Sequence, residues 1–377
     1  MLDSDARIFN LNPPPLFRGT LSFCQVIAQG HLGRVLAVAP HPSQPLYATV
    51  ASDKSIRMWD AEERKMLAIA KLPVQGNCLS YHPEGNVVAV GSMAGEIMLM
   101  QFTVDTGAWT PVARRGVGPK IKEKAVKVHE DGSVSVSPVK KQSNKHGVKD
   151  LRFSPDGSVL AIACKDSMVY LLDVNNVRAW ILYFYAPIVR CNFSTTYSPS
   201  SLFVFVEILQ NLKRLATLKG HSTWVSNLDF NVDGSVLQTV DGAKEILFWD
   251  VAKGVQISNA FKLRDEQWAT WTCLLGYPVQ GIWDEEGEHE YHTLCRSNEG
   301  SILACGGDTK VVRVTPFPCL DGSYSAMFPA HSASISAIRF MGDDSMVISV
   351  APDSCIVQWS VQGLDKYANE DEASGRE

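Results

Sequence analysis

The stretch that decides the fold is Ser52-Asp53-Lys54-Ser55-Ile56-Arg57-Met58-Trp59-Asp60, where an Asp in a turn stands six residues before an aromatic residue. Gly30-His31 and an apolar run precede it. The same frame recurs with its turn position at 53, 95, 166, 243, 308 and 353, although Gly95 and Ala243 lack the acid. Tight-turn sequences between short alternating strands lie upstream of most of these positions. The pattern therefore predicts six copies of one four-stranded antiparallel unit.

Such units cannot bury both faces of their sheets alone, so they pack side by side around an axis. We predict an all-β WD-repeat β-propeller of six recognisable blades over residues 30–361. Residues 1–29 are expected to be remnant strands of a preceding blade, so the chain is expected to be a truncated fragment. If these residues form a full blade, the closed ring has seven blades, which would contradict the truncated-fragment view. Residues 8–28 either complete the final blade or leave a gap. The tail, 362–377, is expected to be acidic and disordered.

The recurring polar residues of this frame are predicted to build the blades rather than to bind ligands. A His before a blade and an Asp in its turn can form hydrogen bonds within the blade, while a Trp supplies core area. The residues assigned this structural role are His31, Asp53, Trp59, Asp166, His221, Trp249, Asp308, His331, Asp353 and Trp359.

The intervals between successive turn positions are 42, 71, 77, 65 and 45 residues, so three of them carry extra chain. The 71-residue interval contains residues 114–149, with ten Lys and Arg against three Asp and Glu. This net charge of +7 leaves the rest of the chain near −12. A basic loop of this kind is either a solvated surface segment or a contact for an acidic protein surface, with nucleic acid as the weakest alternative.

The candidate partner-binding residues come from this basic loop: Arg114, Arg115, Lys120, Lys122, Lys124, Lys127, Lys140 and Lys141. Ser137-Pro138 within it is a proline-directed phosphorylation pattern. Phosphorylation of Ser137 would add about −2 of charge and weaken an electrostatic contact.

The 77-residue interval contains an aromatic and apolar insertion, residues 177–210, without blade periodicity. Removing these 34 residues leaves 43, which matches a bare blade. Val177-Arg178 and Gln210 can be encoded by intron-boundary sequences, so we hypothesise a retained intron. A membrane-docking hairpin and a partner-binding insertion remain alternatives. A spanning helix is disfavoured because Pro187 and Arg190 interrupt the apolar run.

Composition and motifs exclude several classes. The net charge of −5 argues against a general polyanion binder, and nine dispersed cysteines without C-x-x-C favour reduced thiols in the cytoplasm. No hydrolase elbow, phosphate-binding loop, dinucleotide fingerprint or zinc-protease motif is present, so we expect no catalytic residue, no cofactor and no metal site. His289 and His292 among glutamates favour an exposed acidic loop over a metal site.

The 65-residue interval is the most specific part of the sequence. Residues 264–276 read Arg-Asp-Glu-Gln-Trp-Ala-Thr-Trp-Thr-Cys-Leu-Leu-Gly, and Gly281-Ile282-Trp283 follow. This stretch resembles the echinoderm microtubule-associated protein-like family, whose C-terminal propeller carries an acidic-x-x-Trp-Ala-x-Trp/Tyr-Thr segment before Leu-Gly and Gly-Ile/Val-Trp. The resemblance covers most of residues 16–361. Trp268, Trp271 and Trp283 are expected to pack an irregular blade, with interface anchoring as the alternative.

The resemblance implies the second propeller of a tandem pair and association with microtubules. We therefore expect a non-catalytic cytoskeletal interaction module. Its expected location is the cytoplasm, on microtubules, with the cilium as a further location. Its expected partners are tubulin and other proteins, with neither nucleic acid nor membrane. The alternative is a general WD-repeat scaffold for a protein complex without tubulin. The two large insertions, 114–149 and 177–210, have no recognised counterpart in the family.

Overall fold

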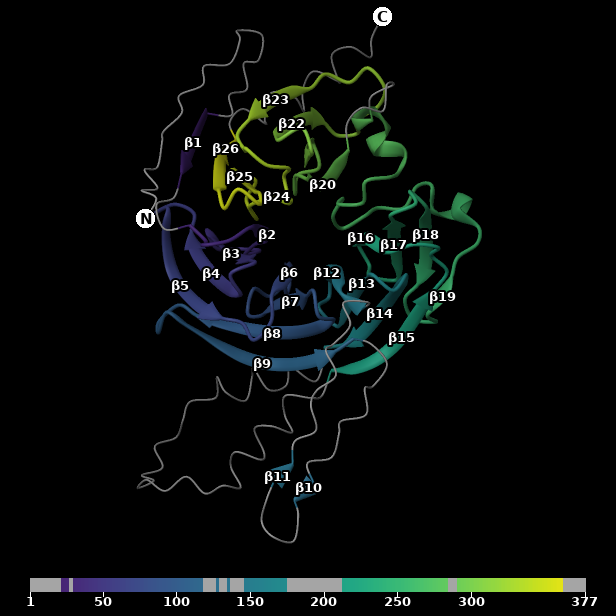
Figure 1. Cartoon of the computed structure of the whole chain (residues 1–377). Coiled ribbons are helices and arrows are strands. Elements are labelled where there is room, and N and C mark those ends of the chain that lie inside the picture. Colours follow the sequence, from purple (N-terminus) through teal and green to yellow (C-terminus); the bar gives the residue numbers. More distant parts are fainter. Residues whose placement is uncertain are drawn as a thin grey trace, which may run out of the picture.

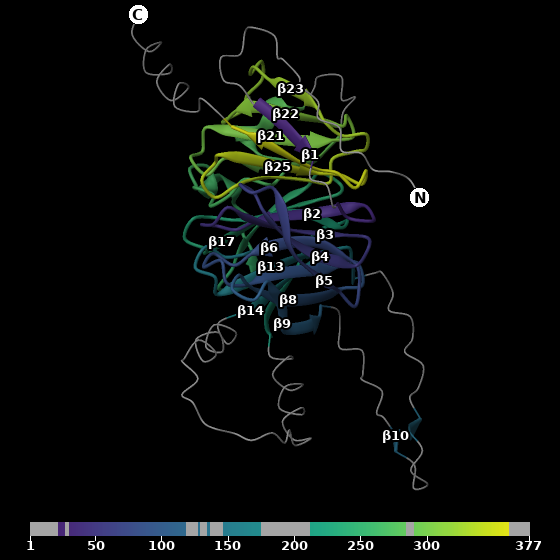
Figure 2. The ribbon, with the colours of Figure 1, turned by 90° about the vertical axis from the view of Figure 1, so that its left-hand side faces the viewer.

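The computed structural model describes residues 22–26, 30–117, 127–128, 134–135, 146–174, 212–283 and 290–361. These residues form six four-stranded antiparallel sheets arranged as blades around a common axis (Figure 1). The predicted six-blade β-propeller is therefore confirmed. Seen from its edge, the ring is a disc with β9 and β23 at opposite ends (Figure 2).

Each blade runs from an inner strand near the axis to an outer strand at the rim. Blade I contains β2 (Val35–Pro40), β3 (Leu46–Ala51), β4 (Ser55–Asp60) and β5 (Lys65–Lys71). Blade II contains β6 (Gly76–Tyr81), β7 (Val88–Ser92), β8 (Glu96–Thr103) and β9 (Ala108–Gly116). Blade III contains β12 (Val148–Phe153), β13 (Val159–Cys164), β14 (Met168–Asp173) and β15 (Lys213–Lys219).

The second half of the ring repeats this order. Blade IV contains β16 (Val225–Phe230), β17 (Val236–Asp241), β18 (Ile246–Asp250) and the short β19 (Val255–Gln256). Blade V contains β20 (Tyr291–Arg296), β21 (Ile302–Gly307), β22 (Val311–Pro316) and β23 (Ala326–Pro329). Blade VI contains β24 (Ala337–Phe340), β25 (Met346–Val350) and β26 (Ile356–Ser360).

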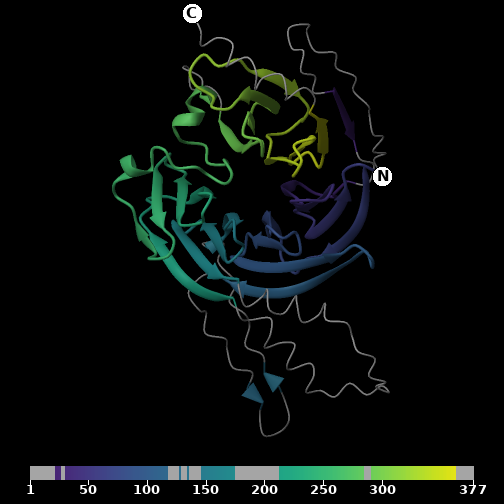
Figure 3. The same ribbon diagram turned by 180° about the vertical axis from the view of Figure 1, so that it is seen from behind.

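The fourth strand of blade VI comes from the other end of the chain. β1 (Ser22–Val26) pairs antiparallel with β26, from Ser22 opposite Ser360 to Val26 opposite Val357. The view from behind shows this strand beside blade VI (Figure 3). Of the two outcomes expected for residues 8–28, the structure shows the first, completion of the final blade, for residues 22–26.

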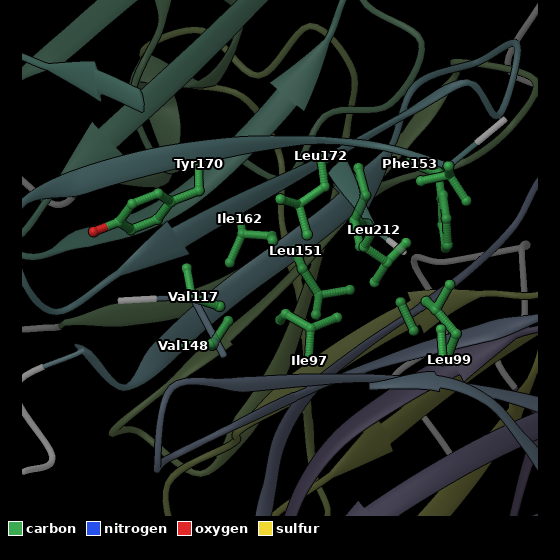
Figure 4. Close-up of a cluster of buried hydrophobic side chains, with 14 of the residues drawn as sticks. Ile97, Leu99, Val117, Val148, Leu151, Phe153, Ile162, Tyr170, Leu172 and Leu212 are labelled. Carbon is green, nitrogen blue, oxygen red and sulfur yellow. The ribbon is translucent and has the colours of Figure 1, made fainter. Parts of the chain in front are cut away.

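The core lies between neighbouring blades, where alternate strand residues of one sheet pack against the next. Figure 4 shows this between blades II and III, with Ile97 and Leu99 of β8 near Leu151 of β12. Val117, near the start of residues 114–149, and Leu212, two residues after 177–210, are 1% exposed and belong to the same cluster. Both insertions therefore have a buried residue close to one end.

Residues 264–283, here called the wedge, lie between blades IV and V without forming a sheet. The wedge follows η2 (Ala260–Leu263) and includes η3 (Tyr277–Ile282). Ala269 N donates to Phe230 O of β16, and Arg296 N of β20 donates to Trp271 O. The wedge thus joins the inner strands of two blades.

Two of the three tryptophans of the wedge are buried. Trp268 and Trp271 are 7% and 4% exposed, and their rings meet edge to face with centroids 6.4 Å apart. Trp283 is half-buried, with the Lys244 ammonium 4.7 Å from its ring centroid. Trp268 and Trp271 therefore supply core area rather than an exposed anchor for a partner.

The ribbon formed by β10 (Lys127–Val128) and β11 (Val134–Ser135) lies within the predicted basic loop. The segments 177–210 and 362–377 lie outside the described residues, as does most of 1–29.

Candidate functional site

A chain of buried hydrogen bonds in blade I joins residues of the repeat frame. His31 Nδ1 lies 3.0 Å from Asp53 Oδ2, and its Nε2 lies 2.8 Å from Thr49 Oγ1. Trp59 Nε1 donates to the same hydroxyl over 2.7 Å. Burial raises the pKa of Asp53, but hydrogen bonds from Ser55 and His31 outweigh it and leave the pKa below its usual value. These residues bind one another, as expected of structural groups.

Blade VI contains the same arrangement. His331 Nδ1 lies 3.2 Å from Asp353 Oδ2, and its Nε2 lies 2.8 Å from Ser349 Oγ. Trp359 Nε1 donates to Ser349 over 3.0 Å. A hydroxyl residue in the second half of the second strand thus links the His and the Trp in both blades, a role that the sequence analysis did not assign.

The turn acids of blades III and V have other partners. Asp166 Oδ2 lies 2.7 Å from His146 Nδ1 and accepts a hydrogen bond from the Tyr170 hydroxyl. Asp308 Oδ1 accepts from Glu290 N over 3.1 Å. In both cases the carboxylate holds the segment that leads into the blade.

Blade IV differs at its turn, where Ala243 occupies the position of the acid. His221 Nε2 lies 2.6 Å from Thr239 Oγ1, to which Trp249 Nε1 also donates. Asp241 supplies a carboxylate from the end of β17, with its Oδ2 3.6 Å from His221 Nδ1. The sequence frame missed this substitution because Asp241 stands two residues before the expected slot.

Arg114 and Arg115 are the two partner-binding candidates whose side chains the structure describes. Both lie on β9, and Arg114 forms a two-nitrogen contact with Glu96 Oε2 at 3.0 and 2.6 Å. Burial and the neighbouring charge of Arg214 lower the pKa of Arg115. Only the backbone of Lys127 is described. The others, Lys120, Lys122, Lys124, Lys140 and Lys141, lie outside the described residues with Ser137.

The basic segment leaves the ring and returns to it at nearly the same point. Val117 N donates to Gly95 O over 2.8 Å. A Cβ on Gly95 would lie 2.7 Å from His146 O, and Gly95 has a φ of +78°. The two described ends of the segment, Val117 and His146, therefore both lie beside Gly95, in the turn between β7 and β8.

Charged side chains of the inner strands form a cluster that sequence analysis missed. Arg152 Nε of β12 lies 3.9 Å from Asp229 Oδ1 of β16, and Asp229 is fully buried. Burial raises the pKa of Asp150, although the charges of Arg152 and Arg339 oppose this. Alternating charges in an inner strand, as at 150 and 152, were the available signal. The two acids and two arginines balance one another near the axis.

Reactive chemistry has little support among the described residues. The thiols of Cys78, Cys164 and Cys273 are buried, which raises their pKa values and makes them poor nucleophiles. An open pocket of about 460 Å³ on blade V is lined in part by Asp308 and Arg313. The Arg313 guanidinium already donates to the carbonyl oxygens of the wedge at residues 281 and 282. Every helix in the described part of the chain is too short or too polar to span a bilayer.

Comparison with known proteins gives a family match over nearly the whole ring. Residues 35–361 match the family model described as the echinoderm microtubule-associated protein second beta-propeller. The chain is 30% identical over 357 residues to human echinoderm microtubule-associated protein-like 3, covering 92% of this chain and 33% of the relative.

Two further relatives give similar values. Human echinoderm microtubule-associated protein-like 2 is 28% identical over 339 residues, covering 89% of this chain and 43% of the relative. The 77 kDa echinoderm microtubule-associated protein of Strongylocentrotus purpuratus is 28% identical over 338 residues, covering 89% and 40%. The chain thus spans about a third to two fifths of the length of these relatives.

Proposed function

Because the chain belongs to the echinoderm microtubule-associated protein family, we propose that it is a non-catalytic interaction module that binds microtubules. The observation that carries this proposal is the family match, which extends from β2 to the last residue of the ring, 35–361. The relatives are named as microtubule-associated proteins, and this chain matches only part of their length. Binding by this part is therefore the specific point to test.

Electrostatic attraction gives the proposal a physical mechanism. Residues 114–149 carry a net charge of +7 in a chain whose total is −5. The described ends of the segment, Val117 and His146, both lie beside Gly95. An acidic surface such as that of tubulin would attract this charge, while the rigid blades supply shape-specific contacts. Binding should weaken as salt screens the attraction.

Co-sedimentation of the full chain with microtubules tests the proposal. One variant replaces residues 118–145 by a short Gly-Ser linker, which keeps Val117 and His146 in place. A second variant changes Lys120, Lys122, Lys124, Lys127, Lys140 and Lys141 to Gln at unchanged length. The matched control changes Lys65 and Lys253 to Gln, two exposed lysines on other blades.

We expect both loop variants to bind several-fold more weakly with a shallower salt dependence, and the control to bind like the wild type. Ser137→Glu should lower binding in the same direction. Unchanged binding of the loop variants would move the contact to the blade faces. No sedimentation of the wild-type chain would favour a general scaffold, and affinity purification without tubulin would support that alternative.

We also propose that the protein lies along microtubules in the cytoplasm and, in ciliated cells, along the microtubules of the cilium. Imaging of the tagged chain before and after microtubule depolymerisation tests this. A filamentous signal that disperses on depolymerisation supports it, whereas a signal unchanged by depolymerisation contradicts it.

A further inference from the structure

The turn of blade IV contains a buried histidine nitrogen without a hydrogen-bond partner. His221 is 8% exposed, and its Nδ1 has no partner within hydrogen-bond distance. The nearest carboxylate oxygen, Asp241 Oδ2, lies 3.6 Å away, whereas the corresponding distances are 3.0 Å in blade I and 3.2 Å in blade VI. A separation of 3.6 Å is too long for a hydrogen bond. A buried polar atom left in this state needs an explanation, and a bound ion is one.

The hydrogen bonds around Thr239 are compatible with a lone pair on His221 Nδ1. Thr239 Oγ1 accepts from Trp249 Nε1 and can donate to Leu247 O, 3.3 Å away. When the hydroxyl donates to Leu247, His221 Nε2, 2.6 Å from this oxygen, is the donor. A neutral imidazole with its proton on Nε2 presents a free lone pair at Nδ1. The bond to Thr239 also fixes the ring orientation, as outer partners of metal-binding histidines do.

Two carboxylates lie close to this histidine. One oxygen each of Asp241 and Glu245 and a nitrogen of His221 all lie within 4.8 Å of one another. The Asp241 carboxylate is held in place by the backbone nitrogens of Thr223, Ala243 and Glu245, at 3.2, 3.0 and 2.9 Å. Glu245 is exposed, so an ion can reach the group from solvent.

The residues at the equivalent positions of blades I and VI explain why, among blades I, IV and VI, only blade IV places two carboxylates beside its histidine. Glu245 stands two residues after the turn slot, where blade I has Ser55 and blade VI has Cys355. Ser55 Oγ lies 3.1 Å from His31 Nδ1 and donates to Asp53 Oδ1. In blade I a neutral hydroxyl thus helps to close the His–Asp pair. In blade IV a second carboxylate replaces it.

We propose that His221 Nδ1, Asp241 and Glu245 bind a zinc ion, with water as the fourth ligand. Imidazole nitrogen and carboxylate oxygen are typical zinc ligands at about 2.0–2.2 Å, which places adjacent ligand atoms of a tetrahedron roughly 3.4 Å apart. The 3.6 Å between His221 and Asp241 fits such an edge. Calcium and magnesium prefer oxygen ligands alone, so the imidazole selects a transition metal. The ion would fasten the entry to blade IV to its turn, where blades I and VI use hydrogen bonds.

Zinc titration of the full chain under reducing conditions tests this inference, with the affinity measured by competition against a coloured chelator. Co²⁺ in place of zinc should give visible absorption without a thiolate charge-transfer band. Zinc should raise the unfolding midpoint of the wild type, because it binds only the folded site. Glu245→Gln, at an exposed position, should fold normally and weaken binding roughly tenfold or more. Glu245→Ser, which copies Ser55 of blade I, should do the same.

His331→Gln in blade VI is the matched control and should leave zinc affinity unchanged. Equal zinc affinity of the wild type and Glu245→Gln would overturn the inference. A thiolate band in the Co²⁺ spectrum of the wild type would also overturn it if that band disappeared in Glu245→Gln, because the site would then contain a cysteine. Both readouts are independent of microtubule binding, so failure here leaves the proposed function untouched.

Discussion

Blade I and blade IV build the same buried bonds and then differ on their solvent side. In both, a threonine hydroxyl joins the histidine Nε2 to the tryptophan Nε1, with distances from 2.6 to 2.8 Å. In blade I the turn acid Asp53 closes the other side of the histidine, whereas blade IV has Ala243 there and uses Asp241 from the strand. The buried bonds between threonine, histidine and tryptophan tolerate little change, because an unpaired polar group is costly there. The contact between the histidine and its acid lies nearer to solvent, so its residues and its chemistry can change.

The two blades also differ in what their inner strands face. At the same inner-strand position, blade I has Ala39 and blade II has Ser80, whereas blade IV has Asp229. Asp229 accepts hydrogen bonds from the backbone nitrogens of residues 272 and 273 and from two threonine hydroxyls of the wedge. Blade IV therefore carries a buried charge because the wedge brings donors to it.

The largest expected effect comes from removing the tryptophans that the two blades share. Trp59 and Trp249 are 0% and 2% exposed. Trp59→Ala and Trp249→Ala should each lower the free energy of unfolding by about 3–5 kcal/mol, because each leaves a large cavity. Urea unfolding measures this. Trp→Phe at each position serves as the control and should cost less. A much smaller loss for Trp249→Ala would show that blade IV does not depend on its core as blade I does.

A somewhat smaller effect is expected at Asp229, where the blades differ. Asp229→Ala leaves the buried nitrogens of residues 272 and 273 without an acceptor, at about 1–3 kcal/mol each. Ser80→Ala in blade II is the matched control and should cost less than about 1 kcal/mol, since the Ser80 hydroxyl makes only a long contact of 3.4 Å. Equal urea midpoints for the two variants would contradict the role of Asp229 in holding the wedge.

Sequence reasoning could predict the six blades because the turn and strand pattern of a bare blade is contained within about 45 consecutive residues. It could not predict contacts between distant segments. Asp229 and Thr272 are 43 residues apart, and β1 pairs with β26 across the whole chain. Arg152 and Asp229 meet only because β12 and β16 are neighbours in the ring.

The site was harder to predict than the fold. In blade IV the acid stands at 241, two residues before the expected position 243, and a fixed spacing rule does not detect such a shift. The metal search in the sequence considered His289 and His292, because they lie near glutamates in the chain. His221, Asp241 and Glu245 come together only when the entry to blade IV folds against its turn. The composition revealed the basic loop, whereas the position of Val117 and His146 beside Gly95 required the structure.

Blade III extends the comparison to the connection between the third and fourth strands. In blade I, Asp60 pairs with Lys65 across a four-residue turn. In blade III, Asp173 pairs with Lys213, so removing 177–210 would leave a five-residue turn, residues 174–176 and 211–212. Deletion of 177–210 should stabilise the fold by about 1–2 kcal/mol, because closing a longer loop costs more entropy.

Urea unfolding of the deletion variant measures this change. Deleting only Asn175 and Asn176, the residues just before the insertion, is the control and should change the midpoint little. A loss of several kcal/mol on deleting 177–210 would mean that these residues support the ring, which would contradict the retained-intron hypothesis. Transcript sequencing across the junction tests that hypothesis at the level of the gene.

The smallest expected effect is a pH dependence from the closed histidine of blade I. Burial lowers the pKa of His31 below its usual 6.5, although Asp53 opposes the shift and Arg57 adds to it. The unfolded chain therefore takes up a proton at a higher pH than the folded chain does. This contribution to stability is complete above about pH 6.5 and is lost as the pH falls below it.

Urea midpoints of the wild type should thus fall between pH 7 and 5, and His31→Gln should flatten that slope. His292→Gln, at an exposed position in blade V, is the control and should keep the wild-type slope. If His31→Gln and the wild type lose stability equally over this range, the buried imidazole of blade I does not set the pH response.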